Sequence, residues 1–79
     1  MNIVEELNAV FDDVMLKCEA VKSCENEQWS VFCIFWIFNG EYSVSVINKD
    51  NGKMAMIDNL DRYAAHRAYD EMCELHGLA

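Results

Sequence analysis

The pair Asn39-Gly40 constrains the fold most, because it separates two segments that each carry a strand pattern. A type I′ turn needs positive φ at both central positions, which Asn and Gly adopt readily, so the pair predicts a two-residue hairpin turn. The first arm, residues 29–38, is rich in aromatic and β-branched residues, and the second, residues 41–48, alternates apolar and polar residues. The two arms predict an antiparallel pair whose first strand is apolar on both faces.

The predicted turn also fixes which side chains share a face of the sheet. It places Phe38 opposite Glu41 and Ile37 opposite Tyr42. The apolar side of the second strand then faces the core, and half of the first strand faces the same way. This predicted inner set is Val31, Cys33, Phe35, Ile37, Tyr42, Val44 and Val46.

The outer face of the hairpin collects apolar side chains that we expect another molecule to cover. Aromatic side chains bury roughly 150–250 Å² each, so three of them exceed what soluble monomers usually expose. Ser43 and Ser45 lie on the same face and argue against a complete second layer from this chain. The predicted outer patch is Phe32, Ile34, Trp36, Phe38, Ile47, Met54 and Met56. Three alternatives remain open for what covers this patch: a terminal segment of this chain, a second copy in a homodimer through the sheets, or a foreign partner.

Helical patterns flank the predicted hairpin. Apolar residues recur with a helical period over residues 3–22, with Asn2 as a cap, and residues 23–28 form a loop. A turn at 49–52 and a short third strand at 53–58 follow the hairpin. A last helix is capped by Asp58 or Asn59 and runs to about His76, where Gly77 stops it. Its predicted apolar side is Leu60, Ala64, Ala65, Ala68, Met72 and Leu75.

These elements predict an α+β fold of order α-β-β-β-α: a three-stranded antiparallel meander with both helices on one face, a two-layer sandwich. The 79 residues, 53% of them hydrophobic and none of them proline, suit a single domain over residues 1–79. The longest apolar run, 31–38, is too short to span a bilayer, and the N-terminus lacks the basic start of a signal peptide. We expect a cytoplasmic protein whose four cysteines are reduced thiols.

Acidic residues dominate the charge of the chain. Its net charge of −8 disfavours direct binding to nucleic acid or to an anionic membrane, since both reward Lys and Arg. On the predicted first helix, Glu5, Asp12 and Glu19 recur every seven residues, and Glu6 and Asp13 form a neighbouring stripe. This acidic stripe is either a solvated helix face or a stand-in for phosphates that binds a basic protein surface.

Candidate chemistry is sparse. His66, Cys73 and His76 lie within about a quarter turn of one another on the last helix, but no CxxC or HxxxH pair accompanies them. Cys24 is the one cysteine in a predicted loop, and it lacks the glycine-rich turn or GxSxG elbow of a nucleophile site. We expect no enzyme activity, no cofactor and no metal.

Two resemblances bear on function. The predicted α-β-β-β-α order resembles the double-stranded RNA-binding domain, but residues 59–64, Asn-Leu-Asp-Arg-Tyr-Ala, lack the lysine-rich helix start that binds RNA in that family. In size, acidity and aromatic content the chain is similar to small phage-encoded anti-CRISPR inhibitors, which implies a binding protein without cofactor, acting in the host cell cytoplasm. The predicted function is a non-enzymatic module that inhibits a nucleic-acid-binding effector by occupying a basic surface or blocking assembly. The alternative is a homodimeric structural or adaptor protein paired through its outer sheet face.

Overall fold

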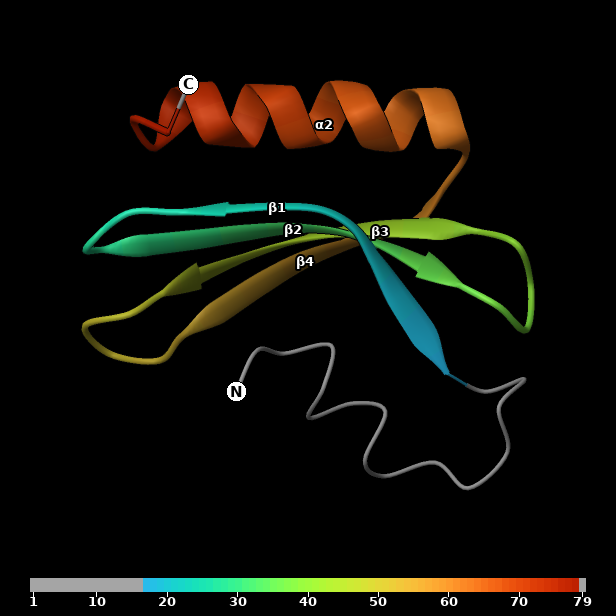
Figure 1. Ribbon diagram of the computed structural model, residues 1–79, viewed down its shortest axis with the longest axis horizontal. Coiled ribbons are helices and arrows are strands. Elements are labelled where there is room, and N and C mark those ends of the chain that lie inside the picture. The colour runs from blue at the N-terminus through green and yellow to red at the C-terminus, as the bar shows by residue number, and fades with distance from the viewer. Residues whose placement is uncertain (1–16, 79) are drawn as a thin grey trace.

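The computed structural model describes residues 17–78, which form one antiparallel sheet and one helix (Figure 1). The strands are β1 (Cys18–Glu25), β2 (Trp29–Trp36), β3 (Tyr42–Asn48) and β4 (Met54–Leu60), and the helix is α2 (Arg62–Leu75). Each strand pairs with the next in the order β1-β2-β3-β4. Helix α2 lies along one face of the sheet, over β2 and β3.

The prediction of a three-stranded meander with two helices is wrong, because the sheet has a fourth strand. Residues 18–22, predicted as the end of the first helix, and residues 23–25, predicted as loop, form β1. The rest of the predicted first helix lies outside the described residues. The physical reason is hydrogen bonding: in a three-stranded sheet β2 would be an edge strand, with half of its backbone N–H and C=O groups unpaired beside apolar side chains. Pairing with β1 makes β2 a central strand.

The β2–β3 turn is longer than the predicted two residues. Phe35, not Ile37, lies opposite Tyr42, and Gly40 N–H donates to the Trp36 carbonyl at 2.9 Å. Gly40 has φ of 70°, the positive value for which glycine is suited. The register differs from the predicted one by two residues, which is one full period of a strand, so each side chain keeps its predicted face.

The main core lies between the sheet and α2. Val31, Cys33, Val44 and Val46 pack there, as the pattern predicted, against a buried side of α2 formed by Ala65, Tyr69 and Cys73. That helix side is rotated from the predicted one, and Leu75 is 73% exposed. The cap differs too: the Asp61 carboxylate accepts from Ala64 N–H at 2.7 Å, whereas Asp58 and Asn59 belong to β4.

Each edge strand contains a bulge that switches the faces of its side chains. In β4 the pairing changes between Tyr42–Leu60 and Val44–Ile57, so one residue is inserted, and Asn59 there has φ of 60°. The insertion turns Leu60 onto the helix face, where it packs against the core. In β1 the pairing shifts between Ala20 and Lys22 in the same way.

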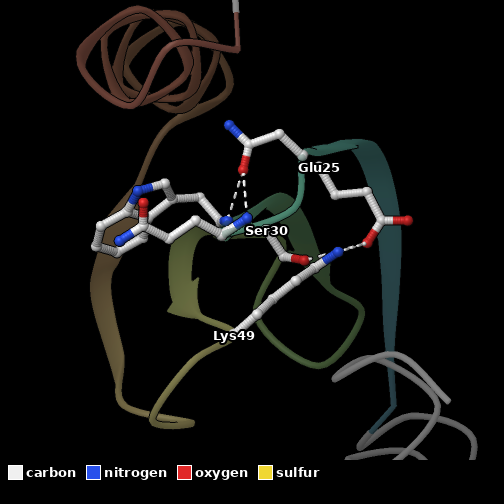
Figure 2. Close-up of polar contacts among 6 residues, drawn as sticks. Glu25, Ser30 and Lys49 are labelled. Atoms are coloured by element: carbon white, nitrogen blue, oxygen red, sulfur yellow. Dashed lines mark hydrogen bonds and ion pairs between the residues drawn. The ribbon is translucent and has the colours of Figure 1, made fainter.

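An ion pair ties together two turns at one end of the sheet (Figure 2). Lys49 Nζ lies 2.6 Å from Glu25 Oε2, and Ser30 Oγ donates to the same carboxylate oxygen at 3.4 Å. The hydrogen bond and the charge of Lys49 lower the pKa of Glu25. This contact is at the surface, so it contributes little to the stability of the fold.

Candidate functional site

The outer face of the sheet, opposite α2, is buried at its centre. Phe32 and Ile34 are 8% and 0% exposed and form a second cluster with Cys18, against which Trp36, Ile47 and Met56 pack. Ser43 and Ser45 are also buried, at 1% and 0%. Helix α2 does not provide this burial, because it lies on the other face. In this fold Phe32 and Ile34, two members of the predicted outer patch, are therefore buried together with the two serines.

A hydrogen-bonded chain of side chains crosses the outer face at the edge of this cluster. Trp36 Nε1–H donates to Ser43 Oγ at 2.8 Å, and Ser43 Oγ–H donates to Asp58 Oδ1 at 2.7 Å. The three residues come from β2, β3 and β4. The buried Ser43 hydroxyl is thus both acceptor and donor, and the network fixes the Asp58 carboxylate and the Trp36 indole next to each other.

A cavity of about 350 Å³ opens beside this network. Phe38, which is 55% exposed, places its ring 6.2 Å from that of Trp36, centroid to centroid, in an edge-to-face arrangement. Glu41 approaches from the β2–β3 turn, where Asn39 both donates to its carboxylate and accepts from its backbone N–H. We call this the Trp36 pocket, and it is lined by Trp36, Phe38, Asn39, Glu41, Ser43, Asp58 and Asn59.

The charged side chains among the described lining residues of the Trp36 pocket are both acidic. Glu41 and Asp58 supply two carboxylates, and no Lys, Arg or His stands among those residues. In the part of the chain that the structure describes, neither carboxylate forms an ion pair. Aromatic faces with carboxylates beside them attract a cation through both charge and the ring quadrupole. The pocket can therefore accept a guanidinium or ammonium group.

Only some of the residues predicted to bind a partner lie close together in the fold. Trp36 and Phe38 line the pocket, while Met54 is 47% exposed at the edge strand β4. Glu19 is exposed on β1, so the seven-residue helical spacing does not include it. The other members of the predicted acidic stripe lie outside the described residues: Glu5, Glu6, Asp12 and Asp13.

The pocket carboxylates were not singled out from the sequence, although a signal for them existed. Strand alternation places Glu41 and Ser43 on the outer face, and it places Asp58 there with Met54 and Met56. Alternation alone could not predict that hydrogen bonds link Asp58 on β4 through Ser43 on β3 to Trp36 on β2. That juxtaposition depends on the register of three strands.

Among the described residues, the histidines and cysteines considered from the sequence do not come together as a metal site or as a nucleophile with its base. Within residues 17–78, no group of three or more His, Cys, Asp or Glu side chains could hold a metal ion. His76 Nδ1 lies 2.8 Å from the Met72 carbonyl and its ring packs 4.3 Å from that of Trp29. Cys24 Sγ contacts Cys73 Sγ at 2.8 Å, and no contact pairs it with a histidine base among the described residues.

No protein-family model matches this chain, and neither the curated proteins nor the solved structures yield a significant match. Among the described residues, α2 is too short and too polar to cross a membrane.

Proposed function

We propose that this chain is a small acidic, non-enzymatic protein-binding module that takes a basic side chain of its partner into the Trp36 pocket. The observation that carries the proposal is the meeting of two aromatic rings with two carboxylates that no described cation neutralises. An arginine fits this chemistry best, because its planar guanidinium stacks on an indole while it donates to carboxylates.

The geometry of the pocket supports the binding of a ligand. The Asp58 carboxylate already accepts from Ser43, and the Trp36 indole donates its N–H to the same hydroxyl, so both groups are held before a ligand arrives. Side chains fixed in advance lose less conformational entropy on binding. The overall charge of −8 adds attraction to a basic surface at longer range.

In its specific form, the proposal is that the partner is a nucleic-acid-binding effector and that the module inhibits it by occupying its basic surface. What supports this is the excess of carboxylates together with the shape of the pocket, since surfaces that bind phosphates are rich in Arg and Lys. The acidic residues at 5, 6, 12 and 13 would extend the same attraction.

The direct test is a titration of the protein with an arginine-rich peptide, followed by the fluorescence of Trp36 in a Trp29→Phe background. We expect saturable binding that weakens as salt rises, and a loss of about tenfold in affinity for Asp58→Asn, whose amide oxygen still accepts from Ser43. A labelled oligonucleotide bound to the same peptide should be released as the protein is added.

The matched control is Asp50→Asn, which removes the same charge from an exposed turn far along the sheet from the pocket. It should reduce affinity by less than about twofold, because screened surface charges contribute little. If the two variants weaken binding equally, net charge and not the pocket binds the peptide. If no peptide binds, the proposed function fails.

The alternative function is a homodimer paired through the outer face. The burial of Phe32 and Ile34 leaves less apolar surface for it, but Phe38 and Met54 remain 55% and 47% exposed. Strand β4 also lies at the edge of the described sheet, where a second copy could pair.

A further inference from the structure

Two thiols far apart in sequence meet where the end of β1 lies against the last turns of α2. Cys24 Sγ and Cys73 Sγ are 2.8 Å apart, and 49 positions separate the two residues. An S–S bond is about 2.04 Å long, so a movement of less than about 1 Å would bring the sulfurs to bonding distance. The other two cysteines, Cys18 and Cys33, are buried on opposite faces of the sheet.

The bulge in β1 is what brings Cys24 to the helix. Before the bulge, Cys18 pairs with Trp36 and belongs to the outer cluster. After it, Cys24 pairs with Val31 and packs against the core under α2. In an unbroken strand, residues 18 and 24 would share a face, because they are an even number of positions apart. The inserted residue therefore places Cys24 beside Cys73.

Several contacts hold the two thiols in this position. The Asn26 side chain donates to the His76 carbonyl at 3.3 Å, and the Trp29 ring packs against that of His76. Lys22 Nζ lies 5.5 Å above the ring of Tyr69, one turn before Cys73. The end of β1 and the β1–β2 turn are thus joined to the end of α2 on both sides of the sulfur pair. Figure 1 shows that this turn and the C-terminal end of α2 lie at the same end of the molecule.

The two thiols differ in access. Cys24 is partly exposed on the edge strand β1. Cys73 is 6% exposed, and burial followed by the hydrogen bond with Cys24 raises its pKa to about 11. A reagent in solution meets Cys24 first, and Cys73 is placed to react second.

We propose that Cys24 and Cys73 form a reversible disulfide that fastens α2 to the sheet, with a small-molecule disulfide such as oxidised glutathione as oxidant. The Cys24 thiolate attacks one sulfur of the reagent, which forms a mixed disulfide and releases one thiol. Cys73 then loses its proton and attacks Cys24 Sγ, which forms the protein disulfide and releases the second thiol. Two cysteine thiols are oxidised and one reagent disulfide is reduced to two thiols.

The disulfide closes a loop that runs through all three hairpin turns and into α2. Closing a loop of this length removes conformational entropy from the unfolded chain, so the oxidised protein should unfold at a higher temperature. Because the sulfurs already touch in the reduced fold, little rearrangement is needed. The Trp36 pocket lies at the other end of the sheet, so this inference does not depend on the proposed function.

The test is to incubate the full chain with oxidised glutathione, block remaining thiols after denaturation, and cleave after glutamate. Cleavage at Glu19, Glu25, Glu27, Glu41, Glu71 and Glu74 leaves the four cysteines in four different peptides. We expect residues 20–25 and 72–74 to be joined, with a loss of two hydrogen masses from the intact protein, and Cys18 and Cys33 to be alkylated. The Tm should rise by about 10 °C or more and return with dithiothreitol.

Two variants separate the steps. Cys73→Ser should stop at one glutathionyl group on Cys24, and Cys24→Ser should take up neither a glutathionyl group nor an internal bond at Cys73. The oxidant should not raise the Tm of either variant. A different pairing, or two separate glutathionyl adducts on the unmodified protein, would overturn the proposal.

Discussion

At the scale of single residues, Ser43 and Ser45 show how two similar positions acquire different roles. Both lie on the outer side of β3 and both are almost fully buried. The Ser43 hydroxyl accepts from Trp36 and donates to Asp58, whereas Ser45 Oγ has no hydrogen-bond partner among the described residues. A buried hydroxyl costs free energy unless it is hydrogen-bonded, so the two serines should respond in opposite ways to the same substitution.

Ser43→Ala should lower the free energy of unfolding by about 1–2 kcal/mol, because it leaves the Trp36 indole N–H and the Asp58 carboxylate without their common partner. Ser45→Ala should leave it unchanged or raise it by up to about 1 kcal/mol, because an unsatisfied hydroxyl is removed. Urea denaturation followed by tryptophan fluorescence measures both. Equal destabilisation by the two substitutions would contradict the assigned network.

At the scale of elements, the two edge strands differ from the two central ones. Strands β2 and β3 are buried, while β4 pairs only with β3 in the described sheet and exposes Met54 and Ile57. A free edge with apolar side chains is a site at which another strand can pair. This edge is the feature on which the homodimer alternative now depends.

Met54→Lys tests the edge, since a lysine on an edge strand disfavours pairing with a second copy. If the homodimer alternative holds, the unmodified protein should self-associate as its concentration rises in sedimentation equilibrium, and Met54→Lys should remain monomeric with a free energy of unfolding within about 0.5 kcal/mol of the unmodified protein. The control is Tyr63→Lys, which adds the same charge at a residue 75% exposed on α2 and should not change the association. An unmodified protein that stays monomeric would remove the homodimer alternative.

At the scale of the whole molecule, buried cysteine thiols and the phenol of Tyr69 make the free energy of unfolding depend on pH. Burial raises the pKa of Cys18 and Cys33, and burial with hydrogen bonding to Cys24 raises that of Cys73 from 9.0 to about 11. Burial and hydrogen bonds to Cys24 and Cys73 likewise raise the pKa of Tyr69. Above the unfolded thiol pKa, the unfolded chain loses protons that the folded chain retains, so stability falls as pH rises.

The urea midpoint of the reduced protein should therefore be lower at pH about 10.5 than at pH about 8. Most of the loss due to Cys73 should occur between its unfolded pKa of 9.0 and its folded pKa of about 11. In Cys73→Ala the midpoint should depend less on pH over that interval. A midpoint that is constant from neutral pH to pH about 10.5 would contradict the raised pKa values.

The sequence by itself determined the faces of the central hairpin and the position of the last helix. Period-two alternation sorted Val31, Cys33, Val44 and Val46 onto the core face, and an error of two residues in the turn did not change that result. Gly77, with φ of 74°, follows the C-terminal end of α2 as predicted. Local conformational preferences are sufficient for such features.

Only the tertiary structure decided the fourth strand, the bulges and the pocket. Cys18 and Val21 fit a helical period, but residues 18–25 form a strand. This strand satisfies the backbone hydrogen bonds at the edge of β2, and such pairing depends on residues distant in the sequence. The bulges in β1 and β4 send Cys24 and Leu60 to the helix face, against simple alternation. The Trp36 pocket and the Cys24–Cys73 contact each join residues from separate elements, and their distances depend on strand register and helix packing.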